Sequence, residues 1–238
     1  MSTYVVGDIH GCYYTLKKLI SSLNIQESDK LIFLGDYIDR GPHSKDVVEY
    51  VKNLSKDKSV IALKGNHEQM CVYGFDKQLW LHNGGVETLK SYDDRTPEEK
   101  KMPSFKEKEA RQIWLKNQPT ISKEHMEWIM DLPLYHEDEN YFYVHAGVNP
   151  VLSLDEQTEQ DMLWIREPFI QSEKDFNKTI IFGHTPFKKV FMETNKIGID
   201  TGCVYGNYLT AFETENGVFF QQKIDERDYN EYSKRAKR

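Results

Sequence analysis

Short runs of consecutive apolar residues alternate with amphipathic stretches through the first part of the chain. The runs at 4–6, 31–34 and 60–63 have the length of strands, and each is followed by a polar block that contains glycine. Between the runs, apolar residues recur at helical spacing over 16–23 and 47–54. This order of strand, helix, strand, helix and strand predicts an α/β protein with parallel strands joined by right-handed crossovers.

The pattern changes between about residues 70 and 135, where strand signals disappear and the run 98–101 is fully charged. Helical stretches are predicted around 113–115 and, after the potential N-cap Ser122, over 126–130. We interpret the region as a helical insertion that packs on the sheet domain. Its tryptophan and methionine side chains are expected in the core.

Strand patterns then return until near the C-terminus. The runs lie at 141–144, 179–182, 197–199, 208–212 and 218–220. The last two are expected to pair antiparallel, because the intervening Asn216-Gly217 is typical of a tight turn. We therefore predict a single domain over residues 1–228, followed by a solvated basic tail over 229–238.

The composition indicates a globular protein that is not membrane-bound. The chain has 238 residues, of which 39% are apolar and 13% aromatic, so it can bury a substantial core. No apolar run approaches the roughly 18 residues of a membrane helix, and the first residues lack the pattern of a signal peptide. Three cysteines without a CxxC pair suggest free thiols, and a cytoplasmic location is expected.

The charge balance restricts the partners. The formal net charge of −7 argues against bulk nucleic-acid binding, which needs a basic surface. A substrate that carries phosphate is still compatible, because bound metal ions can dominate the local field. The sequence does not indicate an oligomeric state.

Five of the predicted strands end in polar blocks with residues that can bind metal. In chain order the blocks contain Asp8 and His10, Asp36 and Asp39, Asn66 and His67, His145, and His184. Functional groups of open α/β sheets collect at the carboxyl ends of the strands, so these blocks are expected to meet. One histidine after a strand is usually structural, but five strand ends would not all carry such residues by chance. Outside the blocks, a structural role is expected for His43, His82, His125 and His136.

The types of side chain restrict the metal. Carboxylates, imidazoles and an amide, without a thiolate, suit Mn²⁺, Fe²⁺, Ni²⁺ or Zn²⁺ better than Ca²⁺. The set exceeds the needs of one catalytic ion, so we predict two divalent ions, about 3.5–4 Å apart, with one carboxylate between them.

The blocks also form a known series of motifs. They read Gly-Asp-Ile-His-Gly at 7–11, Gly-Asp-Tyr-Ile-Asp-Arg-Gly at 35–41, Gly-Asn-His-Glu at 65–68, His-Ala-Gly at 145–147 and Gly-His-Thr at 183–185. This series resembles the signature of the phosphoprotein phosphatase superfamily of metallophosphoesterases, in particular its small bacterial and phage-lambda-type members. The resemblance implies a calcineurin-like α/β fold, a two-sheet β-sandwich flanked by helices.

The resemblance also implies a role for each site residue. One metal, with Mn²⁺ favoured over Fe, Zn or Ni, would be held by Asp8, His10 and Asp36, and the second by Asp36, Asn66, His145 and His184. His67 matches a general acid and Asp39 the carboxylate that orients it, while Arg40 and Arg166 match two phosphate-binding arginines. A hydroxide that bridges the metals would attack the phosphorus in line, and His67 would protonate the leaving group.

The implied activity is hydrolysis of phosphate monoesters, most closely that of a serine/threonine protein phosphatase. The alternative is a diadenosine tetraphosphate hydrolase of the same superfamily, because the stretch 199–207 resembles one found in bacterial members of both kinds. Asp39 favours the phosphatase, since many symmetrical tetraphosphatases lack it. A non-catalytic metal-binding scaffold is a remote third alternative.

Overall fold

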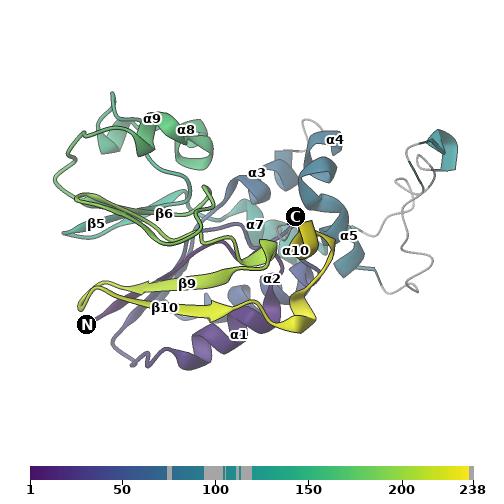
Figure 1. Ribbon diagram of the computed structural model, residues 1–238, viewed down its shortest axis with the longest axis horizontal. Coiled ribbons are helices and arrows are strands. Elements are labelled where there is room, and N and C mark those ends of the chain that lie inside the picture. Colours follow the sequence, from purple (N-terminus) through teal and green to yellow (C-terminus); the bar gives the residue numbers. More distant parts are fainter. Residues whose placement is uncertain (74–76, 94–103, 105, 111–112, 114–119, 236–238) are drawn as a thin grey trace.

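The computed structural model describes residues 1–73, 77–93, 104, 106–110, 113 and 120–235. The chain forms two five-stranded sheets that face each other, with helices on the outer side of each (Figure 1). The two-sheet α/β sandwich implied by the resemblance is therefore confirmed.

The first sheet has the strand order β10-β9-β1-β2-β3. Its strands are β1 (Thr3–Val6), β2 (Lys30–Phe33), β3 (Val60–Ala62), β9 (Tyr208–Glu213) and β10 (Val218–Lys223). β1, β2 and β3 are parallel, as predicted from the crossovers, whereas β9 is antiparallel to both β1 and β10. The turn between β9 and β10 contains Gly217 with a φ angle of 67°, which confirms the predicted hairpin.

The second sheet has the order β4-β5-β6-β8-β7. Its strands are β4 (Tyr135–Glu137), β5 (Tyr141–Val144), β6 (Thr179–Phe182), β7 (Phe191–Glu193) and β8 (Lys196–Gly198). β5, β6 and β8 are parallel, and β4 and β7 close the edges in antiparallel orientation. Neither edge strand was predicted, because each has three residues, two of them exposed, and carries no apolar run.

Three layers of apolar side chains hold the sandwich together. Helices α1 (Tyr13–Ser22) and α2 (Ser44–Leu54) pack on the outer face of the first sheet, and α8 (Glu159–Trp164) and α9 (Glu167–Ile170) pack on the second. The middle layer includes Val5, Ile32, Tyr143 and Ile181. Because both faces of these strands are covered, they read as continuous apolar runs in the sequence.

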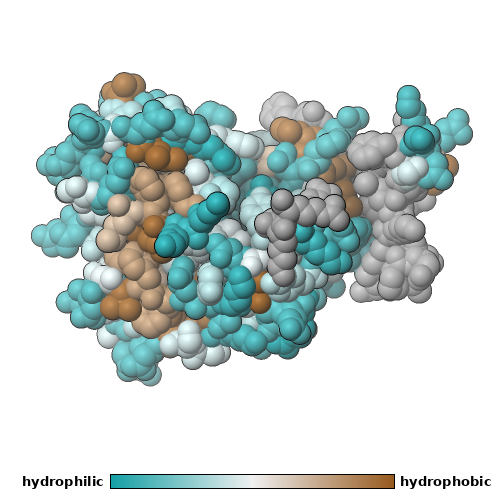
Figure 2. Space-filling model, viewed as in Figure 1, coloured by the Kyte–Doolittle hydropathy of each residue, from teal (hydrophilic) through white to brown (hydrophobic). Residues whose placement is uncertain are grey.

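The middle layer reaches the surface on one side. Figure 2 shows an apolar band over the side of the sandwich that carries β6, β9 and β10, between more hydrophilic areas. Partly exposed residues packed against the middle layer include Tyr141, Val190 and Phe219. No helix in the described part of the chain is long and apolar enough to cross a membrane.

In the described part of the insertion the regular elements are helices, joined by loops, and no strand occurs between β3 and β4. Its elements are α3 (Asn66–Tyr73), α4 (Lys77–Trp80), a π-helical turn (Leu81–Gly85), α5 (Val86–Ser91) and α7 (Lys123–Met130). Ser122 caps α7 as predicted, since its side chain accepts the N–H of His125 at 3.3 Å. Of the helix predicted at 113–115, only Ile113 lies within the described residues.

The segment expected to be a solvated tail instead contains ordered structure up to residue 235. Helix α10 (Glu231–Arg235) follows Asn230, and the side chain of Ser233 is fully buried. The reason is that polar side chains of this segment bond to distant backbone groups, which a hydrophobic pattern does not report. The domain boundary itself stays a prediction.

Candidate metal centre

The candidate site lies where the parallel strands of both sheets end. In the first sheet, β1, β2 and β3 lead to Asp8 and His10, Asp36 and Asp39, and Asn66 and His67. In the second sheet, β5, β6 and β8 lead to His145, His184 and Asp200. The carboxyl ends of parallel strands share one edge of a sheet, so the loops of the two facing sheets converge there.

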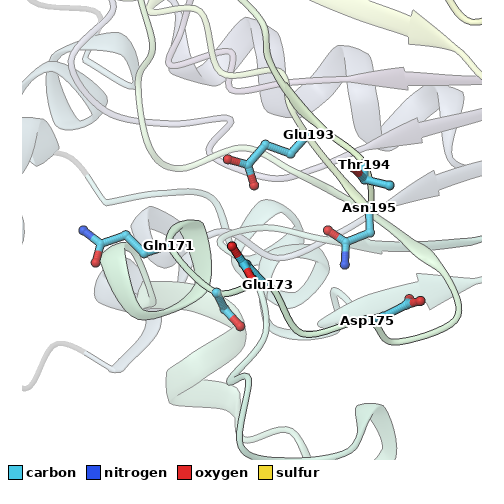
Figure 3. Close-up of a pocket in the computed structure, with 7 residues that line it drawn as sticks. Gln171, Glu173, Asp175, Glu193, Thr194 and Asn195 are labelled. Atoms are coloured by element: carbon cyan, nitrogen blue, oxygen red, sulfur yellow. The ribbon is translucent and has the colours of Figure 1, made fainter.

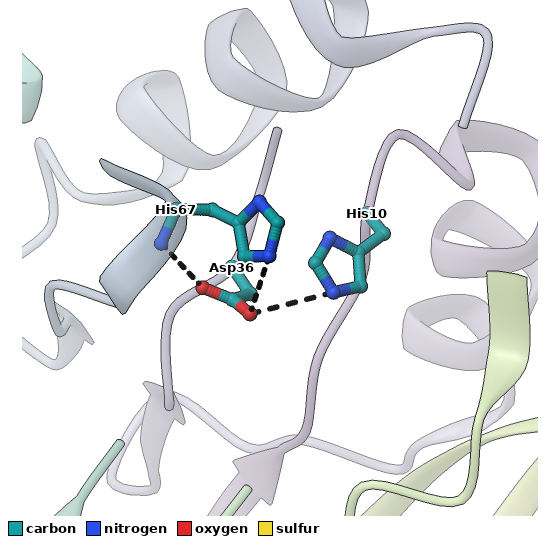
Figure 4. Close-up of side chains that lie close together, drawn as sticks. All are labelled: His10, Asp36 and His67. Atoms are coloured by element: carbon teal, nitrogen blue, oxygen red, sulfur yellow. Dashed lines mark hydrogen bonds and ion pairs between the residues drawn. The ribbon is translucent and has the colours of Figure 1, made fainter. Parts of the chain in front are cut away.

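Asp36 lies at the centre of this cluster and is 2% exposed. Its Oδ2 atom lies 3.3 Å from Nε2 of His10 and 3.9 Å from Nε2 of His67, and its Oδ1 atom lies 3.4 Å from Nε2 of His145. Figure 4 shows the imidazoles of His10 and His67 turned toward the carboxylate. One carboxylate therefore faces side chains from both sheets.

Asp36 belongs to two buried groups of three side chains, and the ligand atoms within each group lie within 4.8 Å of one another. One group adds His10 and His67, and the other adds His145 and His184. Carboxylate and imidazole suit first-row divalent cations, and a carboxylate shared between two groups suits a binuclear centre.

Two further predicted ligands border these groups. Oδ1 of Asn66 lies 2.9 Å from Nε2 of His145 and 2.9 Å from Nδ1 of His184, so the amide oxygen joins the second group. Asp8 is in neither group of three, and its oxygens accept the backbone N–H of His184 at 3.1 and 3.0 Å. All six predicted ligands meet at one edge, together with His67, which was expected to be the proton donor and not a ligand.

The backbone orients two of the imidazoles. Nδ1 of His10 lies 2.9 Å from the carbonyl oxygen of Ile38, and Nδ1 of His145 lies 2.9 Å from that of Leu34. A carbonyl can only accept, so each Nδ1 carries the proton and each Nε2 presents a lone pair to the cluster. Burial lowers the pKa of His145 to about 4 and that of His10 well below its usual value, which keeps both rings neutral.

The positive charge of Arg40 compensates the carboxylates of the cluster only in part, because burial has the larger effect on their pKa values. Burial raises the pKa of Asp36 to about 7 and that of Asp200 to about 6, and it raises the pKa of Asp8 well above its usual range. Divalent cations would supply the missing positive charge, and the neutral imidazoles complete a suitable set of donors. The residues therefore fit a divalent-metal centre.

The loops that carry the cluster have unusual backbone conformations. Positive φ angles occur at His10 (47°), Asp36 (54°), Asp39 (72°), Arg40 (67°) and His184 (62°). Apart from these five residues, Asn177 is the only described residue other than glycine with a positive φ angle. Such conformations cost about 1–3 kcal/mol each and persist where the surroundings fix them, which is typical of functional sites.

A second polar arrangement lies beside the metal ligands. Nδ1 of His67 lies 2.6 Å from Oδ2 of Asp39. Asp39 is fully buried and also accepts hydrogen bonds from Nε1 of Trp80 (2.9 Å to Oδ2) and from Oγ1 of Thr88 (2.6 Å to Oδ1). The last two residues come from α4 and α5 of the insertion. The pairing of His67 with Asp39 follows the sequence expectation, whereas the contributions of Trp80 and Thr88 were missed.

The two arginines lie over opposite groups. Nη1 of Arg40 is 2.6 Å from Nε2 of His10, and Nε of Arg166 is 3.1 Å from Nε2 of His184. Each guanidinium group thus borders one of the two ligand groups. An anion that reaches the cluster would meet both of them.

Sequence reasoning also missed two buried acids. The carboxylate of Glu68 accepts the backbone N–H groups of Asp36 (2.8 Å), Tyr37 (2.9 Å) and Gly65 (3.0 Å), so it fixes the loop that presents Asp36. Asp200 follows β8 as the other blocks follow their strands. The pattern that identified the other site residues also occurs here, because an apolar run precedes Asp-Thr-Gly. No local signal marked Glu68 as a support of another loop.

A separate open pocket of about 600 Å³ lies away from this cluster (Figure 3). It is lined by Gln171, Ser172, Glu173, Asp175, Glu193, Thr194 and Asn195. Asp175 and Asn195 precede β6 and β8, so the pocket lies at the amino ends of these strands, opposite the end that carries the histidines. None of its lining residues belongs to the candidate site.

Comparison with known families agrees with this geometry. The model of the calcineurin-like phosphoesterase family matches residues 1–229. The asymmetrical bis(5'-nucleosyl)-tetraphosphatase PrpE of Oceanobacillus iheyensis is 28% identical over 89% of this chain and 88% of the relative. Serine/threonine-protein phosphatase 1 of Salmonella typhimurium is 31% identical over 87% of this chain and 89% of the relative.

Solved structures share the fold. A putative diadenosine tetraphosphatase superimposes with a TM-score of 0.69 at 22% identity, over 94% of each chain. A cold-active protein tyrosine phosphatase gives a TM-score of 0.63 at 18% identity, over 97% of this chain and 80% of that one. At these identities the likeness concerns the fold.

Proposed function

Because this chain belongs to the calcineurin-like phosphoesterase family and is a metal-dependent phosphoesterase, we propose that it hydrolyses dinucleoside polyphosphates such as diadenosine tetraphosphate. The observation that carries the proposal is Asp36, one carboxylate shared by two buried ligand groups below two arginines. Most of the similar relatives with a named activity are tetraphosphatases, both asymmetrical and symmetrical, which favours the dinucleotide over the phosphoprotein expected from the sequence.

The proposed ligand sets are those implied by the motifs. Asp8, His10 and Asp36 would hold one ion, and Asp36, Asn66, His145 and His184 would hold the other. Two divalent cations, with Mn²⁺ favoured, would supply an activated water and neutralise the phosphate oxygens when bound. The backbone carbonyls behind His10 and His145 keep their Nε2 lone pairs directed at the site.

The remaining residues would bind the substrate and move a proton. Arg40 and Arg166 would bind the non-bridging phosphate oxygens through their guanidinium groups. His67 would donate the proton on Nε2 to the leaving oxygen. Its other nitrogen, Nδ1, faces Asp39 at 2.6 Å, which holds the ring in that orientation.

A serine/threonine protein phosphatase is the second candidate. Two observations favour it, namely the intact pair of His67 and Asp39 and the 31% identity to a named serine/threonine phosphatase. A phosphate monoester of serine has a poor leaving group, so it depends on a well-oriented acid such as this pair.

One experiment separates the two candidates. The protein is loaded with Mn²⁺, and kcat/KM is compared for diadenosine tetraphosphate and for phosphoserine, phosphothreonine and phosphotyrosine peptides. We expect the dinucleotide to be preferred by about 100-fold, equivalent to about 2.7 kcal/mol in transition-state binding. A preference for the phosphopeptides would replace the first candidate by the second. The Asp36→Asn variant serves as the control for contaminating activity.

A further inference from the structure

Residues 225–235, here called the strap, cross the loops at one side of the site. The strap contains the 3-10 turn Glu226–Asp228 and helix α10, and it lies beside the loops that follow β1, β2 and β8. In Figure 1 the last helix lies near the carboxyl ends of the strands, next to the insertion. This position beside the loops of the site suggests that the strap has a role at the site in addition to stabilising the fold.

The strap is anchored at the start of helix α1. Both oxygens of Asp228 accept bonds there, from the backbone N–H of Tyr14 at 3.2 Å and from the N–H and hydroxyl of Thr15 at 2.7 and 2.6 Å. The N-cap residue of α1, Cys12, makes no capping bond with its own side chain. Asp228 therefore caps the helix that begins directly after the metal-ligand block at 8–11.

A second anchor lies on the loop that follows β8. The hydroxyl of Ser233 is fully buried and donates to the carbonyl oxygen of Val204 at 2.8 Å. Val204 belongs to the 3-10 turn Cys203–Tyr205. The ring of Tyr205 lies 5.6 Å below the guanidinium carbon of Arg40, within the range of a cation–π contact.

Asn230, between the two anchors, contacts Arg40 itself. Its side-chain amide donates to the backbone carbonyl of Arg40, and its Oδ1 accepts the N–H of Tyr232 at 2.9 Å. Arg40 has a φ angle of 67°, and its N–H donates to the carbonyl of Gly84 at 3.2 Å. The left-handed conformation of Arg40 is thus held by the insertion on one side and by the strap on the other.

We infer that the strap is a positioning element for phosphate binding and that Asn230 is its positioning residue. This inference rests on the phosphate-binding role of Arg40 in the proposed function. Without the bond from Asn230, the Arg40 peptide can relax toward an ordinary φ angle, which turns the side chain away from Tyr205 and from the phosphate. The strap thereby sets the affinity for phosphate without contacting the substrate.

The test compares Asn230→Ala with Asn216→Ala in full-length, Mn²⁺-loaded protein. Asn216 is a matched control, because its amide also donates one hydrogen bond (3.1 Å to Glu213) but lies in the turn between β9 and β10. The dissociation constant of inorganic phosphate is measured by calorimetry, alongside kcat, KM, metal content and Tm. We expect Asn230→Ala to weaken phosphate binding and to raise KM about tenfold, the size of one lost hydrogen bond. kcat and metal content should stay near those of the parent, and Asn216→Ala should change none of these quantities.

Two further variants make the outcome decisive. In an Arg40→Ala background, Asn230→Ala should weaken phosphate binding no further, because it acts through the arginine. Asn230→Asp keeps the size of the side chain and the acceptor for Tyr232 but loses the donor. It should therefore weaken phosphate binding as Asn230→Ala does, and it replaces Asn230→Ala in the test if that variant is unstable. If folded Asn230→Asp binds phosphate as tightly as the parent while Arg40→Ala binds it more weakly, the inference about Asn230 is wrong and the phosphate-binding role of Arg40 stands. Unchanged affinity in Arg40→Ala would overturn the phosphate role and the inference together.

Discussion

The indole nitrogen of Trp80 donates to both carboxylate oxygens of Asp39, at 3.1 Å to Oδ1 and 2.9 Å to Oδ2. This contact connects the helical insertion to the proposed proton donor, because Asp39 holds His67 at 2.6 Å. The insertion would therefore contribute to the proposed chemistry as well as to the core.

Trp80→Phe is expected to lower kcat about tenfold for substrates with poor leaving groups, since a hydrogen bond to a buried carboxylate is lost. The loss should be smaller for p-nitrophenyl phosphate, whose leaving group needs little protonation. In a His67→Asn background the same substitution should add nothing. Trp128→Phe is the control, because Trp128 lies in α7 and its ring packs on the ring of Tyr37. Equal losses for both leaving groups would contradict the orienting role.

His67→Asn tests whether this residue is the acid or a metal ligand, since its Nε2 lies 3.9 Å from Oδ2 of Asp36. We expect two bound ions to remain and kcat for alkyl phosphates to fall by about 10²–10⁴. The metal content is measured by elemental analysis after gel filtration. Loss of one ion from the folded variant would instead make His67 a ligand.

Asp36→Asn is expected to abolish binding of both ions and activity together, because its two oxygens face different ligand groups. Calorimetric titration with Mn²⁺ gives the number of sites. The substitution of Asp131 in the turn after α7 is a control for general effects of removing a carboxylate. Two ions retained by Asp36→Asn would refute the shared ligand.

Arg166→Ala is expected to raise KM for phosphate esters by about tenfold or more, through loss of a charged hydrogen-bond donor. Its Nε lies 3.1 Å from Nε2 of His184, at the edge of the second ligand group. Steady-state kinetics with two substrates of different size provide the measurement. Unaltered KM would mean that the motif match at this position is misplaced.

Metal binding is expected to release protons below neutral pH. In protein freed of metal by chelation, burial keeps the pKa of Asp36 at about 7, so its carboxyl group is protonated below that pH. The pKa of His145, lowered to about 4, leaves this ring neutral at the same pH. A cation favours the ionised carboxylate, so affinity should fall as the pH drops through about 7. Calorimetry at about pH 6 and about pH 8, in buffers of different ionisation enthalpy, should show more protons released at the lower pH. Equal release at both would count against Asp36 as the titrating ligand.

The sequence predicts those parts of the site that are encoded locally. An apolar run followed by a polar block specifies a strand end, and the parallel arrangement brings blocks such as those at Asp8, Asp36 and Asn66 to one edge. The second sheet followed from the family resemblance and not from the pattern, because two of its strands, β4 and β7, are short and largely exposed.

The supporting contacts could not be predicted, because they join residues far apart in the chain. Trp80, the last residue of α4, bonds to Asp39, which lies 41 positions earlier in the chain. Asp228 caps a helix that begins more than two hundred positions earlier, and Asn230 reaches Arg40 over a similar separation. Hydrophobic periodicity describes which face of an element is buried, and it contains no information about such pairs of polar groups.

The proposed ligands of the centre are divided between the two layers of the sandwich, with Asp36 on the loop after β2 and His145 and His184 after β5 and β6. An ion held by these three residues would cross-link the two layers, as a disulfide does, but reversibly. A cation that binds only the folded state increases the free energy of unfolding. The cation concentration would therefore set the stability of the contact between the two layers. Activity and the stability of the sandwich would then both depend on the concentration of the same ions.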